Sequence, residues 1–209
     1  NKLETRSAHF KLQIDAVIFL YSLLPLIDTG KFSEATRMIN THKEGILDRI
    51  NLLSAEKQIQ LLLYCAIVYL GTDEPHKARK IITQIIQSDR NVFSLPLFRT
   101  TRLVYLMVLY EQKDFDYMDF EIRSLKREIK NNEKSYQLEQ VVLKCLRKCP
   151  DELSEYKRIH LLNKLKPQLE EIQNNKYEMQ LLHVFNFIAW IESKMFKIPL
   201  EKVLQEKLK

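Results

Sequence analysis

The sequence is poor in glycine, and this shortage excludes several classes of fold. Glycine occupies 3 of the 209 positions, whereas its average share of about 7% would give roughly 15. Sandwiches, barrels and propellers depend on many tight turns in which glycine adopts positive φ angles. Gly30, Gly45 and Gly71 are also isolated, so the phosphate-binding patterns GxGxxG and GxxxxGKS or GxxxxGKT are absent. The composition therefore favours an all-α protein.

Cysteine is scarce and odd in number, which argues against a secreted disulfide framework. Cys65, Cys145 and Cys149 occur in a chain without an Asn-x-Ser or Asn-x-Thr site, so we expect a reducing, cytoplasmic location. Cys145 and Cys149 are four positions apart on one predicted helix, but no CxxC motif or histidine cluster would complete the four ligands of a structural zinc ion. We interpret all three as structural thiols and predict neither a metal nor a cofactor.

Long hydrophobic runs are missing as well. The most apolar run, residues 16–27, has twelve residues and includes Ser22 and Pro25, which is well short of the roughly 20 residues of a membrane span. We interpret it as a buried helix and predict no membrane span. The chain begins at Asn1 without a charged and then apolar signal segment, so we expect it to be the C-terminal part of a longer protein.

Catalytic motifs are also absent from the sequence. The five histidines are scattered singly, and HExxH, GxSxG and paired-carboxylate motifs do not occur. Asp114, Asp116 and Asp119 lack the glycine-centred loop and terminal glutamate of a calcium site, so we interpret them as the acidic start of a helix. Trp190 lies among apolar residues at helical spacing, which favours a place in the core. We predict that the chain is not an enzyme.

What the sequence does contain is helical periodicity in almost every segment, with Gly, Pro, Asn or Asp at the breaks. The predicted helices cover about 8–28, 33 to the early forties, 54–70, 74–87, 97–112, 116–131, 133–148, 151–174, 176–196 and 200–207. A further turn is expected over 45–52, and Pro167 is expected to kink or split the helix 151–174. Short connections make neighbouring helices antiparallel. Five hairpins result, at about 8–50, 54–90, 97–131, 133–174 and 176–209, in one domain spanning 1–209.

The junctions inside the predicted hairpins are alike. Gly30–Ala35, Asp73–Ala78 and Lys113–Met118 have similar sequences, and Ile198–Val203 is a terminal version. Ala35, Ala78 and Met118 are 43 and 40 positions apart. Self-similarity at such a period indicates a solenoid of stacked hairpins, because one hairpin alone cannot bury its apolar face.

At these junctions the chain resembles the tetratricopeptide repeat (TPR) family over about residues 15–205. Gly30, Phe32 and Ala35 match the family's turn and the small residue that follows it. The chain departs from the family in a period longer than the usual 34 residues, and in Leu23, Leu106 and Pro75. The C-terminal end is also similar to that of uncharacterised bacterial repeat proteins. The resemblance implies a right-handed α-solenoid of about five hairpins that acts as a protein-interaction scaffold.

The TPR resemblance also implies a concave surface lined by the first helix of each hairpin. The residues predicted to bind a partner there are apolar: Leu63, Ile67, Leu103, Met107 and Tyr110. Such a groove either binds an amphipathic or extended peptide, or is already covered by a second copy or by the preceding part of a longer chain. The alternative is that these side chains contact one another as ordinary core.

Basic residues form one local cluster in a chain whose net charge of +6 is otherwise evenly spread. Arg123, Lys126, Arg127 and Lys130 are three and four positions apart and share a helix face, which we call the basic stripe. They are candidates for contact with an anion. Glu121 and Glu128 dilute the stripe, and neither base-stacking aromatics nor a known module accompanies it, so a solvated face is the simpler interpretation and nucleic acid is not expected.

These observations leave three functions open. The first is a scaffold that binds a protein or peptide segment in the apolar groove. The second is a regulatory sensor in which Arg99, Arg102 and the basic stripe hold a small ligand or nucleic acid. The third is an accessory domain of an enzyme whose active site lies outside these residues.

Overall fold

A computed structural model describes the backbone of residues 2–87, 96–131, 136–148 and 150–208, and their side chains except at 2–6, 96, 130–131 and 150. Most of the described residues are helical, and none of them forms a strand. The all-α class is therefore confirmed. The chain divides into two compact units, Asn1–Thr101 and Arg102–Lys209, which we describe separately.

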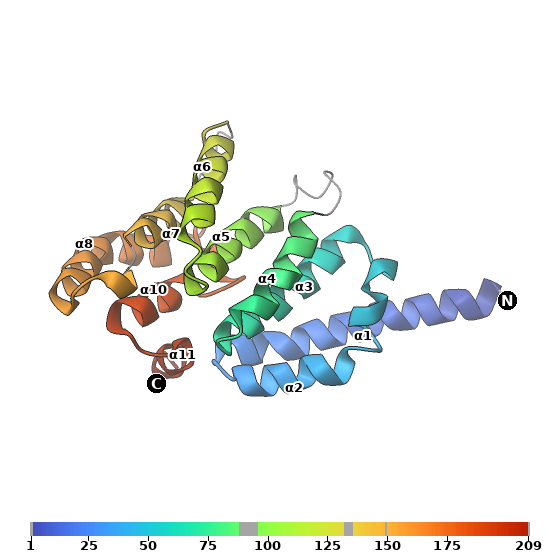
Figure 1. The fold of residues 1–209 in the computed structure, drawn as a ribbon. Coiled ribbons are helices and arrows are strands. Elements are labelled where there is room, and N and C mark those ends of the chain that lie inside the picture. The colour runs from blue at the N-terminus through green and yellow to red at the C-terminus, as the bar shows by residue number, and fades with distance from the viewer. Residues whose placement is uncertain (1, 88–95, 132–135, 149, 209) are drawn as a thin grey trace. The chain divides into compact units, whose positions relative to one another are not determined.

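The first unit contains two helical hairpins (Figure 1). The elements are α1 (Lys2–Asp28), α2 (Phe32–His42), the 3₁₀ helix η1 (Leu47–Leu52), α3 (Ala55–Gly71), α4 (Pro75–Ile86) and the beginning of α5 (Pro96–Glu111). The N-terminal half of α1 extends beyond α2. Between α2 and α3 the packing is close, because a Cβ atom added at Gly71 would lie 2.5 Å from the buried ring of Phe32.

The second unit is built around α10 (Phe187–Phe196), which contacts α7, α8, α11 and η3 and is buried on nearly every side. The other elements are the rest of α5, α6 (Phe115–Asn131), α7 (Gln137–Arg147), the 3₁₀ helix η3 (Pro150–Glu152), α8 (Glu155–Asn174), α9 (Met179–Leu182) and α11 (Leu200–Glu206). Trp190 of α10 is 1% exposed, which confirms its predicted place in the core.

Some predicted helix boundaries were wrong. The helix expected over 176–196 is interrupted between α9 and α10, where the Asn186 side chain accepts a hydrogen bond from the Ala189 N–H and begins a new helix. The helix expected from 151 begins at Glu155, after η3, and runs through Pro167 without a break. The first residues of the helix expected from 133 lie outside the described residues, and α7 begins at Gln137.

The similar junctions in the sequence have the same backbone geometry. Gly30, Asp73 and Lys113 have φ angles of 71°, 58° and 58°. The N–H that follows each of them donates to the carbonyl five residues earlier, with N···O distances of 2.7, 2.8 and 3.0 Å. This left-handed cap satisfies a carbonyl at the end of the first helix and reverses the chain into the second. Lys197, at φ 55°, ends α10 in the same way.

Helix α1 is apolar on two opposite faces. One face is buried in the first unit: Leu12, Ala16, Phe19, Leu20, Leu23 and Ile27. The other is exposed: Phe10, Ile14, Val17, Ile18 and Tyr21. Adjacent positions 18 and 19 therefore have opposite environments.

We expect Phe19→Ala to lower the free energy of unfolding by about 3 to 5 kcal/mol, the usual cost of removing a buried aromatic ring. Phe19 is 1% exposed and its ring stacks on His42 with centroids 5.0 Å apart. The control Ile18→Ala, at a side chain 58% exposed, should change stability by less than about 0.5 kcal/mol. Urea denaturation followed by circular dichroism measures both, and equal losses would contradict this orientation of α1.

We also expect Lys113→Gly to stabilise the protein by about 0.5 to 1 kcal/mol. A left-handed backbone costs a residue with a side chain about 1 to 2 kcal/mol, and glycine avoids this cost. Glycine also loses more conformational entropy on folding, which offsets part of the gain. Arg123→Gly, at an exposed position inside α6, is the control and should cost about 1 kcal/mol. A destabilised Lys113→Gly variant in the same denaturation assay would show that the cap geometry is wrong.

Candidate functional site

An open cleft lies between α6, α7 and α8 of the second unit. Its volume is about 560 Å³, and its lining is Lys126, Ile129, Gln140, Val141, Leu143, Lys144, Arg147, Lys148 and Gln168. Four of these residues are basic, and none is acidic or aromatic. We call this site the basic cleft.

The sequence of α7 explains why its charges line the cleft. Leu138, Val142 and Cys145 are buried, whereas Lys144 and Arg147 are exposed, three positions apart, on the outer face. Basic residues in the last turn of a helix also interact favourably with the negative end of its dipole. The folding of α7 therefore concentrates positive charge at its C-terminal end.

The first turn of α7 is fixed by a buried carboxylate. Glu178, which is 2% exposed, accepts hydrogen bonds from the backbone N–H groups of Gln137 and Leu138 at 2.8 and 3.0 Å. The Glu139 side chain accepts the N–H of Tyr136 at 3.1 Å. Negative charge at the start of a helix is electrostatically favourable. These contacts hold the helix that carries Lys144 and Arg147 and that has Lys148 as its C-cap residue.

The cleft cations make no ion pair with a carboxylate of the described residues. The two acids expected to dilute the basic stripe, Glu121 and Glu128, both pair with Arg102 at 3.0 Å. The two glutamates therefore pair with Arg102 and with none of the four cleft cations. The result is a concave surface with concentrated positive charge.

The structure divides the basic stripe. Lys126 lines the cleft, whereas Arg123 and Arg127 are exposed on α6 outside its lining. The Lys130 side chain lies outside the described side chains. Sequence reasoning missed Lys144, Arg147 and Lys148, although their spacing of three and four is the same signal that singled out the stripe.

Exposed aromatic rings accompany the outer part of the stripe, which sequence reasoning also missed. Phe120 is 51% exposed and Tyr117 is 41% exposed. Their rings stack with centroids 6.1 Å apart. Phe120 shares a helix face with Arg123 and Arg127, because the spacings are three, four and seven.

The residues predicted to form an apolar groove are buried. Leu63 and Ile67 of α3, and Leu103, Met107 and Tyr110 of α5, are each 2% exposed or less. They do not form an open groove in this structure. The alternative that they are core side chains is the one that their burial supports.

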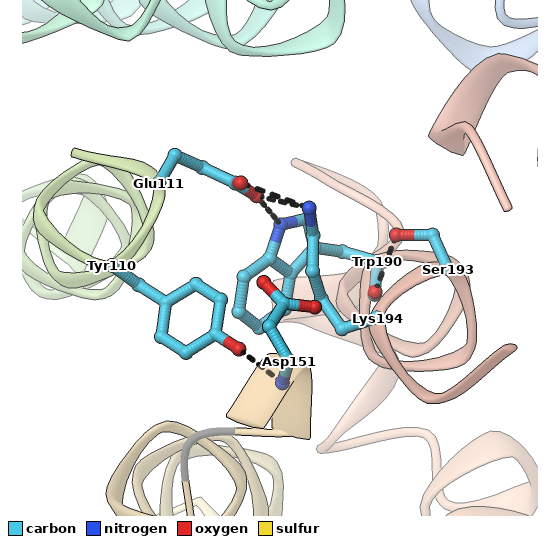
Figure 2. Close-up of polar contacts among 6 residues, drawn as sticks. All are labelled: Tyr110, Glu111, Asp151, Trp190, Ser193 and Lys194. Carbon is cyan, nitrogen blue, oxygen red and sulfur yellow. Dashed lines mark hydrogen bonds and ion pairs between the residues drawn. The ribbon is translucent and has the colours of Figure 1, made fainter. Parts of the chain in front are cut away.

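Figure 2 shows how firmly Tyr110 is held in the second unit. Its hydroxyl accepts a hydrogen bond from the Asp151 N–H at 3.0 Å, and its ring meets Trp190 edge to face at 5.6 Å. The neighbouring Glu111 carboxylate accepts the Trp190 indole N–H at 3.0 Å and pairs with Lys194 at 2.7 Å. Burial raises the pKa of Tyr110. This cluster joins the end of α5 to η3 and α10.

The described residues include no group of three or more His, Cys, Asp or Glu side chains that could hold a metal ion. Burial raises the pKa of the Cys65 thiol to about 12, so this thiol stays protonated at neutral pH. Cys145 is also buried, and Cys149 lies outside the described residues.

Helix α1 has one property that the sequence analysis underestimated. Its segment Ser7–Asp28, 22 residues that include an 18-residue window with a mean hydropathy of 1.6, is long and apolar enough to cross a membrane by length and composition. The apolar pattern extends beyond the twelve-residue run at 16–27 because Phe10, Leu12 and Ile14 precede it. In this structure the same helix supplies core side chains to the first unit, so crossing a bilayer would remove them from that core.

No protein-family model, curated protein or solved structure matches the chain. The support for the candidate site therefore comes from the geometry and charge of its own residues.

Burial of the predicted groove residues can be tested with a charge. Met107→Glu should lower the free energy of unfolding by about 4 kcal/mol or more, because it places a carboxylate at a position that is 0% exposed. Lys166→Glu, at an exposed position of α8, is the control and should change it by about 0.5 kcal/mol or less. If thermal denaturation shows Met107→Glu to be as stable as this control, the groove is open after all.

Proposed function

We propose that this chain is a non-enzymatic binding module whose basic cleft takes an anionic segment of a partner protein. The observation that carries the proposal is the convergence of Lys126, Lys144, Arg147 and Lys148 on one cleft without a described acidic partner. The proposal keeps the predicted scaffold function. It places the contact in the basic cleft, because Leu63, Ile67, Leu103, Met107 and Tyr110 are buried.

Electrostatics favours an anion at this site. Cations held near one another repel, and a bound carboxylate or phosphate relieves that repulsion while forming charge-assisted hydrogen bonds. Arg147 can bind such a group through two N–H donors, whereas the lysines act as point charges. The side chains are exposed, so the attraction is screened by salt. We therefore expect binding that weakens as ionic strength rises.

We further propose that the helices form a TPR-like right-handed α-solenoid of about five hairpins. The shared caps at Gly30, Asp73 and Lys113 support this, since they end the first helix of three consecutive pairs in the same way. The break between α9 and α10 is a departure from regular hairpins. A single domain, a cytoplasmic location and a role beside an enzyme on a longer chain remain proposals of the same kind.

Nucleic acid is a second candidate ligand, favoured by one observation. The exposed ring of Phe120 lies on the face of α6 that carries Arg123 and Arg127. Aromatic rings beside basic side chains are the usual means of binding single strands. Such a site would use the outer face of α6 and not the lining of the basic cleft.

The proposed function predicts that Lys144→Gln with Arg147→Gln weakens the binding of fluorescently labelled polyglutamate by about tenfold or more, measured by anisotropy at low salt. The control variant Lys166→Gln with Lys202→Gln removes the same charge at exposed positions outside the cleft lining. It should change the affinity by no more than about twofold. Equal losses in the two variants would mean that net charge, and not the cleft, attracts the anion.

A further inference from the structure

We infer that the basic cleft takes an acidic polypeptide segment that also carries apolar side chains. This inference rests on the proposed function, and it adds the chemical class of the ligand. The evidence is the combination of charge and apolar surface in one lining.

The floor of the cleft is apolar. Val141 and Leu143 are each 2% exposed, and Ile129 of α6 is half-buried beside them. The hydrocarbon stems of the surrounding lysines and Arg147 add further apolar surface below their charged ends. A ligand that carries only charge would leave the exposed part of Ile129 and these stems in contact with water. A ligand with apolar side chains between its carboxylates would cover the floor and reach the cations.

Polar groups in the lining also suit a polypeptide backbone. Gln168, on α8, carries an amide that can both donate and accept hydrogen bonds. An extended peptide presents N–H and C=O groups in alternation, so it needs partners of both kinds. The cations can supply donors only. Gln168 is therefore the lining group on α8 that can accept from a peptide N–H.

The same lining disfavours nucleic acid. Single strands gain much of their affinity by stacking bases on aromatic rings, and none of the described side chains that line the cleft is aromatic. The exposed rings of Tyr117 and Phe120 are not among the lining residues. A free phosphate ion is also a poor match, because about 560 Å³ lies within the range of sites that enclose much larger ligands.

The test compares four probes on the full 209-residue chain. Two are labelled peptides of equal charge, one alternating glutamate with leucine and one alternating glutamate with serine. The third is an oligothymidylate of matched charge, and the fourth is inorganic phosphate as a competitor. We expect the glutamate–leucine peptide to bind about tenfold more tightly than the glutamate–serine peptide, because burial of one or two leucines accounts for that ratio.

Two variants locate the effect. Lys144→Gln with Arg147→Gln should weaken both peptides about equally, whereas Ile129→Asn should weaken only the glutamate–leucine peptide. The Lys166→Gln with Lys202→Gln variant should leave the ratio between the peptides unchanged. Circular dichroism checks the fold of each variant. The peptide comparison on the unaltered chain does not depend on the folding of any variant.

The outcomes separate the inference from the proposed function. Equal affinity for the two peptides, with both lost in the Lys144 and Arg147 variant, would keep an anion site and overturn the apolar requirement. Tighter binding of oligothymidylate that depends on the same two residues would also overturn the peptide assignment. Displacement of both peptides by phosphate at equimolar concentration would identify a small-anion site. Peptide binding that is unaffected by the Lys144 and Arg147 variant would overturn the proposed function itself.

Discussion

The left-handed helix cap is the constraint on which this architecture depends. An all-helical chain must end each helix and reverse direction, and the last carbonyls of each helix need hydrogen-bond donors. At Gly30, Asp73 and Lys113 one residue with positive φ brings the next N–H back to a carbonyl five residues earlier. Glycine usually occupies such a position. The use of aspartate and lysine instead shows how a chain with only 3 glycines still forms sharp turns between helices.

This cap also explains which parts of the fold could be predicted from the sequence. The hairpin junctions were found because the cap lies in a local pattern that is repeated along the chain. The interruption between α9 and α10 was missed because apolar spacing continues across it, from Leu181 to Phe185 and Phe187. The break depends on the capping side chain of Asn186. An asparagine inside an apolar helical pattern gives a weak local signal, since it also occurs within helices.

The sequence could not decide whether the apolar groove residues line an open surface or belong to the core, and the reason is physical. A helix that is apolar on one side reveals which face is buried, but α3 and α5 are apolar around most of their circumference. Such a helix is usually buried on all sides. Periodicity could not distinguish a groove-facing Leu63 or Met107 from a core residue. The polar contacts of Tyr110 with Asp151 join residues 41 positions apart, which no local pattern indicates.

The basic cleft could not be predicted from the pattern of any one helix either. Its chemistry depends on how three helices assemble. Lys126 was identified from α6 alone, but the cleft exists only because α7 and α8 fold beside that helix. Its cations are exposed and solvated, so keeping them unpaired costs the folded chain little, and an anion gains only a screened attraction. Charge of this kind speeds encounter more than it discriminates between ligands. Discrimination must therefore come from the apolar surface that Ile129 and the hydrocarbon stems of the cations expose, which loses contact with water only when a matching side chain covers it.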